Sequence, residues 1–156
     1  MSYLHDMRKA AARHEEALNR MLELVVLLSD DMTTSLARDG LTVARARLVW
    51  ELRRHGPVTQ KALADALGVS ARNVTGLVDG LAATGFVVRA PHPTDRRATL
   101  VSLTRPGTAT AEELERRQQE FAHYLFSGMP DEQVDGLVAT LTEVLGRLSD
   151  AGLSLR

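Results

Sequence analysis

The feature that most constrains this chain is the turn around Gly68. Leu63 and Leu67 are four residues apart before the glycine, and Ser70 follows two residues after it. Glycine can adopt the left-handed conformation that ends a helix, and serine is a preferred cap for the next helix. The spacing therefore predicts a helix-turn-helix, in which two short helices pack at a steep angle through a turn of about three or four residues.

The second of these helices is expected to be amphipathic. Apolar side chains at helical spacing would face inward, which leaves a polar face with small residues near the helix N-terminus. A helix that enters the major groove of DNA needs donors and acceptors there, and side chains that permit close approach. A solvated surface helix has the same pattern, so the helix alone does not decide between the two. The candidate DNA-contacting residues are Ser70, Ala71, Arg72, Asn73, Thr75 and Gly76.

A predicted two-stranded ribbon with a basic tip follows. Residues 86–89 and 99–103 are β-prone, and the segment between them is rich in turn formers and cations. Its prolines are expected to stiffen the tip and to prevent it from pairing as a strand, so that Arg96 and Arg97 face outward. Asp95 is expected to orient one arginine through a charge-assisted pair. An arginine held in this way suits the narrow, electronegative minor groove of DNA.

These elements together resemble the MarR family of bacterial transcription regulators. The joint motif is specific, although its halves separately are not, and it covers the middle third of the chain strongly. The resemblance implies a mainly α fold with a small β-wing, in which N- and C-terminal dimerisation helices flank a winged helix-turn-helix. The matching pieces are Leu63-Ala64-x-x-Leu67-Gly68-Val69-Ser70, Val74-Thr75-x-Leu77-Val78-Asp79-x-Leu81, Gly85-Phe86-Val87, and Asp95-x-Arg97 followed by Leu103-Thr104-x-x-Gly107.

The resemblance also implies a function. It implies a homodimer that binds palindromic, inverted-repeat operators in double-stranded DNA, usually as a repressor that a small phenolic or carboxylate ligand releases. By position, the helix at residues 70–80 would read bases, Arg97 would enter the minor groove and Asp95 would hold the tip. Many relatives carry a large basic or polar residue where this chain has Gly76, so one phosphate or base contact is expected to be absent.

The charge distribution is typical of a nucleic-acid-binding middle region. Residues 43–105 contain ten basic and four acidic residues, whereas the whole chain has a net charge of −1. The middle therefore carries +6 and the remainder −7. A basic middle between acidic ends indicates a DNA-binding lobe attached to a lobe that does not bind DNA.

Helical patterns on both sides of the basic middle predict a dimer. Residues 4–37 form a long helical pattern, and residues 130–149 carry a continuous apolar face. A helix this long cannot bury its whole stripe against one small domain, so part of it is expected to contact a second subunit. We expect an N-terminal dimerisation helix at 1–38, a winged helix-turn-helix at 41–107 and C-terminal dimerisation helices at 108–150.

An effector site is expected between the dimerisation helices and the winged lobe, because the family binds its ligands there. Trp50, Phe86 and His14 are the candidate lining residues, since an aromatic wall and a polar handle suit an aromatic acid. Ordinary packing around a hinge is the alternative interpretation for each of the three.

Enzymatic chemistry, metal binding and cofactors are not expected. The five histidines are scattered without a His-x-x-x-His pair, and neither a glycine-rich phosphate loop nor a nucleophile elbow is found. The sequence contains no cysteine, which excludes disulfides, thiolate zinc sites and cysteine redox sensing. The polar N-terminus and the short apolar run at residues 24–28 predict neither a signal peptide nor a membrane span, so a cytoplasmic location is expected.

One alternative function belongs to a different class. A winged-helix module can serve protein interaction, with its basic wing in contact with an acidic partner and without specific DNA binding. The Asp95-Arg96-Arg97 tip together with a polar recognition face favours the DNA-binding interpretation.

Overall fold

A computed structural model describes residues 2–153 of the chain. Its elements are mainly helices with one small antiparallel sheet, as the sequence predicts. Contacts within the chain divide it into two compact units, of which the first ends at Ala46 and the second begins at Arg47. The division lies inside α2 (Val43–His55), so the larger part of this helix belongs to the second unit.

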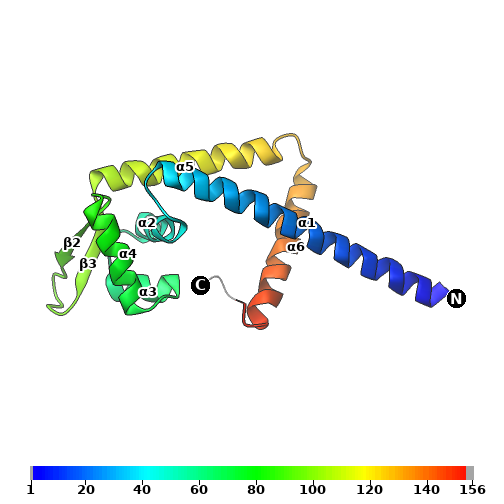
Figure 1. The fold of residues 1–156 in the computed structure, drawn as a ribbon, viewed down its shortest axis with the longest axis horizontal. Coiled ribbons are helices and arrows are strands. Elements are labelled where there is room, and N and C mark those ends of the chain that lie inside the picture. The colour runs from blue at the N-terminus through cyan, green and yellow to red at the C-terminus, as the bar shows by residue number, and fades with distance from the viewer. Residues whose placement is uncertain (1, 154–156) are drawn as a thin grey trace. The chain divides into compact units, whose positions relative to one another are not determined.

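The first unit is dominated by α1 (Ser2–Arg38), an uninterrupted helix of 37 residues (Figure 1). The helix ends where Gly40 adopts the left-handed conformation, with φ at 73°, and the amide of Leu41 donates to the carbonyl of Leu36 at 2.9 Å. Most of its apolar stripe is exposed in the described part of the chain. The large apolar side chains exposed on α1 are Met7, Leu18, Leu22, Leu24, Val25, Val26, Leu27, Leu28 and Met32.

The second unit contains the predicted helix-turn-helix. Thr59 caps α3 by accepting the amide of Ala62 at 3.1 Å, and Gly68 ends it with φ at 63°. Ser70 then caps α4 by accepting the amide of Asn73 at 3.1 Å. These caps and the glycine confirm the predicted turn. The elements of the second unit are β1 (Val58–Thr59), α3 (Gln60–Leu67), α4 (Ala71–Ala83), β2 (Val87–Pro91), β3 (Thr99–Leu103), α5 (Arg105–Phe126) and α6 (Asp131–Asp150).

The core of the second unit lies where α2, α3, α4 and the first half of α5 bury apolar side chains beside the sheet. The inward stripe predicted for α4 is confirmed for Val74, Val78 and Leu81, which are at most 1% exposed. Burial of this stripe orients the opposite face of α4 toward solvent. The other buried side chains are Leu48, Val49, Leu52, Leu63, Ala64, Leu67, Val87, Val101, Ala111 and Leu114.

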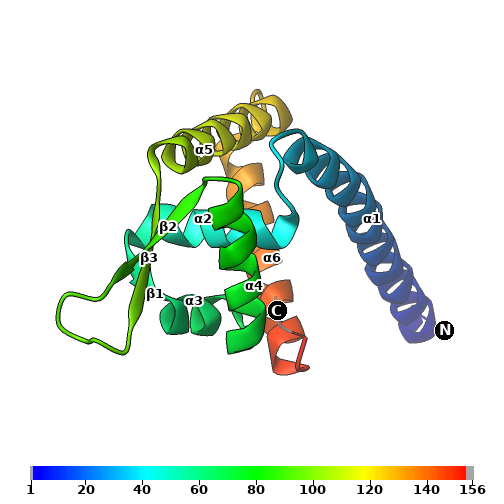
Figure 2. The same ribbon diagram turned by 60° about the vertical axis from the view of Figure 1, so that its left-hand side comes forward.

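The sheet has three strands in the order β1-β3-β2, so the expectation of a two-stranded ribbon was incomplete (Figure 2). The short strand β1 pairs Val58 with Val101 on β3. The expectation that no proline of the tip segment pairs as a strand was wrong for Pro91, which pairs with Thr99. Because β2 is an edge strand, it has a neighbour on one side only and tolerates a residue without an amide hydrogen.

Gly107 lies at the start of α5, where only glycine fits. A Cβ atom there would lie 1.9 Å from the carbonyl oxygen of Phe86, which accepts the amide of Thr104 at 3.0 Å. We expect Gly107→Ala to lower the free energy of unfolding by about 1–3 kcal/mol, the usual cost of overpacking a core. Urea denaturation measures this. Gly136→Ala on α6 is the control, since a Cβ atom there meets nothing within 4 Å; equal stability of the two variants would contradict the prediction.

An ion-pair cluster lies on the surface of α5. The Glu113 carboxylate accepts hydrogen bonds from Arg116 at 2.7 Å and from Arg117 at 2.9 Å. These bonds, that from Arg116 first, lower the pKa of Glu113 to about 2. Since this pKa lies below the ordinary 4.5, the stabilisation is present above pH 4.5 and is lost as the pH falls through about 2. Exposed pairs of this kind stabilise a helix weakly.

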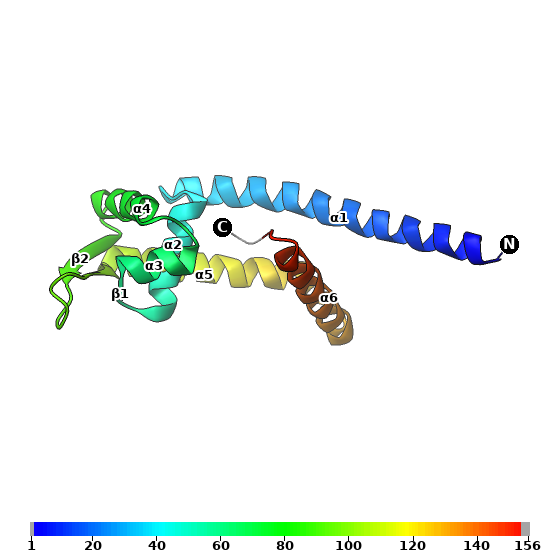
Figure 3. The same ribbon diagram turned by 90° about the horizontal axis from the view of Figure 1, so that it is seen from below.

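The chain changes direction between α5 and α6, as Figure 3 shows. Gly128 adopts the left-handed conformation with φ at 85°, and Pro130 precedes the first residue of α6. The predicted apolar face of α6 is present, but no side chain of this helix is buried. Its exposed large apolar residues are Leu137, Val138, Leu141, Leu145 and Leu148.

Candidate nucleic-acid interface

The predicted reading residues lie on the exposed surface of α4. Arg72, Asn73, Thr75 and Gly76 are exposed, as is Ala71 at the first position of the helix. No atom comes within 4 Å of the Cβ position at Gly76, so packing within the chain does not require glycine there. The structure therefore brings the polar groups of α4 together on a surface that a ligand can approach closely.

Ser70 combines a structural contact with a remaining donor. Its Oγ accepts the amide of Asn73, and the hydroxyl still has a proton to donate. The N-terminus of α4 also presents the partial positive charge of the helix dipole. Ser70 is thus placed where an anionic group such as a phosphate is stabilised.

The wing tip is organised by bonds to the backbone. Asp95 Oδ1 accepts the amide of Arg97 at 3.0 Å, and no ion pair joins Asp95 to Arg96 or Arg97 in the described part of the chain. The expectation of a charge-assisted pair was therefore wrong: the carboxylate orients the backbone of Arg97 instead of its guanidinium. Both arginines are exposed, as predicted.

His92 is a residue of the tip that the sequence interpretation missed. Its Nδ1 atom accepts the amides of Thr94 at 3.3 Å and Asp95 at 3.1 Å. A side-chain acceptor that bonds to amides two and three residues ahead is the arrangement of an Asx-type turn. The pattern His-Pro-Thr-Asp was the available signal for this turn. Together His92 and Asp95 hold the backbone that carries the arginines.

A polar network that the sequence did not reveal joins the wing to the helix-turn-helix. Arg89 on β2 donates from Nη2 to Asp79 on α4 at 2.6 Å and from Nε to Gln60 on α3 at 2.9 Å. Gln60 Nε2 in turn donates to the hydroxyl of Thr75 at 3.3 Å. These residues are 10 to 29 positions apart in the chain, so no local pattern predicts that they meet.

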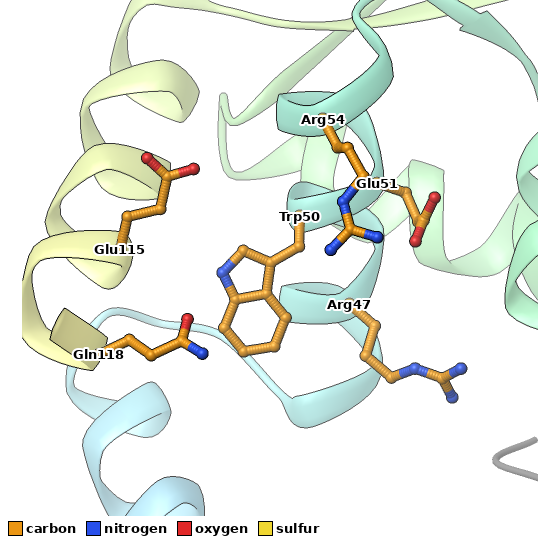
Figure 4. A pocket seen from close by; sticks show the side chains of 6 residues that line it. All are labelled: Arg47, Trp50, Glu51, Arg54, Glu115 and Gln118. Atoms are coloured by element: carbon orange, nitrogen blue, oxygen red, sulfur yellow. The ribbon is translucent and has the colours of Figure 1, made fainter. Parts of the chain in front are cut away.

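A cavity of about 420 Å³ lies between α2 and α5 in the second unit. The side chains of Arg47, Trp50 and Arg54 come from α2, and the indole ring points toward Gln118 on α5 (Figure 4). The Nε1 atom of Trp50 is buried without a hydrogen-bond partner in the described residues. Glu51 and Glu115 complete the lining. The cavity thus combines an aromatic wall with two guanidinium groups.

Each glutamate of the cavity lies beside a basic residue outside it. Glu51 lies 3.4 Å from His55, and Glu115 lies 3.4 Å from Arg53. Because these contacts draw the carboxylates toward other groups, the guanidinium groups of Arg47 and Arg54 give the cavity its anion-binding character.

Trp50 is the one predicted effector residue that lines this cavity. Phe86 is not part of its lining and lies between α4 and β2, where its amide donates to the carbonyl of Leu81 at 2.9 Å. His14 belongs to α1 in the first unit. Sequence reasoning missed Arg47 and Arg54, although their spacing from Trp50 on one helix was a usable signal.

None of the helices within residues 2–153 combines the length and the apolar content that a membrane crossing requires. In the same part of the chain, no group of three or more His, Asp or Glu side chains is arranged to hold a metal ion.

Comparisons with known proteins agree with this architecture. A family model described as the MarR family matches residues 39–98, which include α3, α4 and the wing tip. An uncharacterized HTH-type transcriptional regulator of Mycobacterium bovis is 39% identical over 97 residues, covering 62% of this chain and 68% of that protein. The multiple antibiotic resistance protein MarR of Salmonella typhimurium is 27% identical over 130 residues, covering 82% and 90%.

The structural similarity extends over most of the chain. A crystal structure of a MarR mutant from E. coli complexed with operator DNA has a TM-score of 0.66 and 27% sequence identity. It covers 83% of this chain and 94% of that chain.

Proposed function

Because this chain belongs to the MarR family, we propose that it is a dimeric repressor that binds an inverted-repeat operator and is released by a small aromatic anion. Its class is that of the DNA-binding transcription regulators, not of enzymes, and we place its action in the cytoplasm. The observation that carries the proposal is the exposed polar surface of α4 in one unit with a wing tip that presents two exposed arginines.

The base-reading part of the proposal rests on α4. Its N-terminal half would enter the major groove, where Arg72 suits guanine and Asn73 suits adenine. Ser70 at the N-terminus of α4 would hold a backbone phosphate. In a two-fold symmetric dimer, the two copies of α4 would contact half-sites roughly 10 base pairs apart. The operator is therefore expected to be an inverted repeat.

The wing supplies a second contact outside the major groove. Arg97 would enter the minor groove, which favours A·T pairs where it is narrow. Its backbone is held by Asp95, and the backbone of Asp95 is held by His92. A tip that is ordered before binding loses less conformational entropy on the DNA, which favours affinity.

Dimerisation is supported by the apolar faces of the terminal helices. Leu22 and Val25 on α1 are 54% and 58% exposed, and Val138 and Leu145 on α6 are 58% and 55% exposed. Contiguous exposed apolar surface of this kind typically marks a protein–protein interface. We propose that the two stripes bury one another across the two-fold axis of a homodimer.

The cavity between α2 and α5 is the proposed effector site. An aromatic carboxylate or phenol would pack against the Trp50 ring and pair with Arg47 or Arg54. A ligand that changes how α2 and α5 pack can alter the spacing of the two copies of α4 by rigid-body motion.

A salt-dependent mobility-shift assay tests the DNA-binding proposal. Fragments of the genome that encodes the chain are incubated with the protein at several salt concentrations, and the retained fragments are sequenced. We expect a retained inverted repeat whose binding constant falls with salt, because phosphate contacts release counterions. Equal retention of all fragments, or of none, would favour the alternative winged-helix module for protein interaction.

Effector binding gives a direct optical prediction. The chain has one tryptophan, so its fluorescence reports on the cavity. We expect benzoate at millimolar concentration to quench Trp50 and to weaken operator binding. Arg54→Ala should raise the benzoate concentration needed for half-quenching by about tenfold, which corresponds to one charge-assisted hydrogen bond. Arg147→Ala on α6 removes the same charge and should leave the half-quenching concentration unchanged. Identical quenching in wild type, Arg54→Ala and Arg147→Ala would refute this site.

A further inference from the structure

The hydroxyl group of Thr75 is engaged within the protein. It donates to the carbonyl of Ala71 at 2.8 Å, one turn earlier on α4, and accepts from Gln60 Nε2 at 3.3 Å. A threonine hydroxyl has one hydrogen to donate and two lone pairs to accept with. After these two bonds it has no hydrogen left for a base edge, although Thr75 as a residue is exposed.

The orientation of the Gln60 amide is determined by its other partner. Arg89 Nε donates to Gln60 Oε1 at 2.9 Å, and Arg89 Nη2 donates to Asp79 Oδ1 at 2.6 Å. A guanidinium can only donate, so the atom of Gln60 that faces it is the oxygen. The amide nitrogen is then the atom that faces Thr75, and it requires an acceptor there. The ion pair between Arg89 on β2 and Asp79 on α4 holds the Arg89 guanidinium in place, and thereby the Gln60 amide.

The bond to Ala71 alone would hold the Thr75 hydroxyl only weakly in this orientation. Threonine hydroxyls in helices commonly bond to the carbonyl one turn earlier and can rotate away. The hydrogen bond from Gln60 makes such a rotation less favourable. If the Thr75 side chain rotated about Cα–Cβ so that its hydroxyl pointed outward, both the Ala71 carbonyl and the Gln60 amide would lose their bond to it. The γ-methyl is the part of the side chain that takes no part in these hydrogen bonds.

We propose that Thr75 reads the operator through its γ-methyl, packed against the C5-methyl of a thymine in the major groove, and that Gln60 is the positioning residue for this contact. The inference rests on the proposed function, in which α4 enters the major groove. Thymine is the base that presents a methyl group there, and the threonine methyl is a suitable apolar partner for it. Thr75 would then select thymine without a hydrogen bond.

Two substitutions at Thr75 separate the methyl from the hydroxyl. Thr75→Val keeps a methyl branch and removes the hydroxyl, whereas Thr75→Ser keeps the hydroxyl and removes the methyl. We expect Thr75→Val to bind the operator within about twofold of wild type, because the branching of valine itself holds one χ1 rotamer in a helix and keeps a methyl in place without Gln60. Thr75→Ser should lose about fourfold per protomer, roughly 15-fold per dimer, as for one methylene-sized group removed from each contact. The opposite order of the two variants would overturn the proposal.

The same contact can be tested by removing the methyl group of the DNA instead of that of the protein. Replacing single thymines of the operator by deoxyuracil removes only the C5-methyl. For wild type, a single replacement at the contacted position should lose about fourfold, and replacement of both symmetry-related thymines should lose about 15-fold. Thr75→Ser should bind the thymine and uracil operators equally. If wild type prefers the operator to unrelated DNA but shows the same change in affinity as Thr75→Ser at every uracil substitution, this inference fails and the proposed function stands. If wild type shows no operator preference, the proposed function itself fails.

Gln60→Met tests the positioning role separately from folding. Methionine has a similar length but has no donor for Thr75 and is only a weak acceptor for Arg89. We expect the variant to retain the helical circular dichroism of wild type and to lose most of the uracil effect. In the Thr75→Ser background, Gln60→Met should leave the ratio of the two operator affinities unchanged. A full uracil effect in Gln60→Met would show that Gln60 does not position Thr75.

Discussion

Arg97→Ala is expected to weaken operator binding by about 1–3 kcal/mol per protomer, and so by roughly 2–6 kcal/mol for the dimer. The side chain is exposed at the wing tip, and its backbone amide is held by Asp95 at 3.0 Å. Its loss would therefore remove a minor-groove contact and leave the core of the second unit intact. The slope of log binding constant against log salt should also decrease, because fewer counterions are released.

Fluorescence anisotropy with a labelled operator over a salt series measures both effects. Arg147→Ala on α6 is the matched control, since it removes the same charge from a side chain that is 82% exposed on another element. The control should bind as wild type does. If Arg97→Ala bound the operator as tightly as wild type at every salt concentration, the wing would not contact DNA. That result would favour the protein-interaction alternative.

Val138→Glu is expected to convert the dimer into a monomer and to abolish operator binding. Val138 is 58% exposed in the single chain, so a glutamate there costs the monomer little. In the proposed dimer the same carboxylate would be buried without a partner in each subunit, at a cost of several kcal/mol per ion. A monomer would also lose the second half-site contact, and with it most of the affinity for an inverted repeat.

Light scattering at micromolar protein measures the mass directly. Ala139→Glu adds the same charge to the next residue, which lies on the side of α6 away from the apolar stripe, and should remain dimeric. Circular dichroism shows whether both variants retain their helices. A wild-type protein that is monomeric at micromolar concentration, or a Val138→Glu variant that stays dimeric and binds DNA normally, would refute the proposed interface.

Much of the fold was predictable because its signals are local. Thr59 and Ser70 cap helices through amides three residues ahead, and Gly68 stops a helix through its own backbone conformation. Each of these effects depends on sequence neighbours and needs no information about the rest of the molecule. The apolar spacing of α4 likewise determined which face is buried, and thereby which residues are exposed.

The exposure of the candidate site residues was predictable from the sequence, but the contacts they make were not. The exposure of Arg97 follows from a tip segment full of turn formers, whereas the bond from its amide to Asp95 replaced the expected ion pair. A carboxylate beside two arginines can accept a hydrogen bond from a backbone amide or form an ion pair with a guanidinium group. The sequence does not show which of the two it forms. The cavity beside Trp50 was likewise not predictable in its lining, since its wall combines α2 with α5.

The sequence by itself determined the order of the helices, the helix-turn-helix and the outward placement of the basic tip. Tertiary structure decided which polar atoms meet, as for Gln60 and Arg89, which are 29 residues apart, and which strands pair, as for Val58 and Val101. The physical reason is that core packing brings such groups together in one orientation. The chain contains many chemically equivalent amides, guanidinium groups and β-prone dipeptides, so only that packing selects among them.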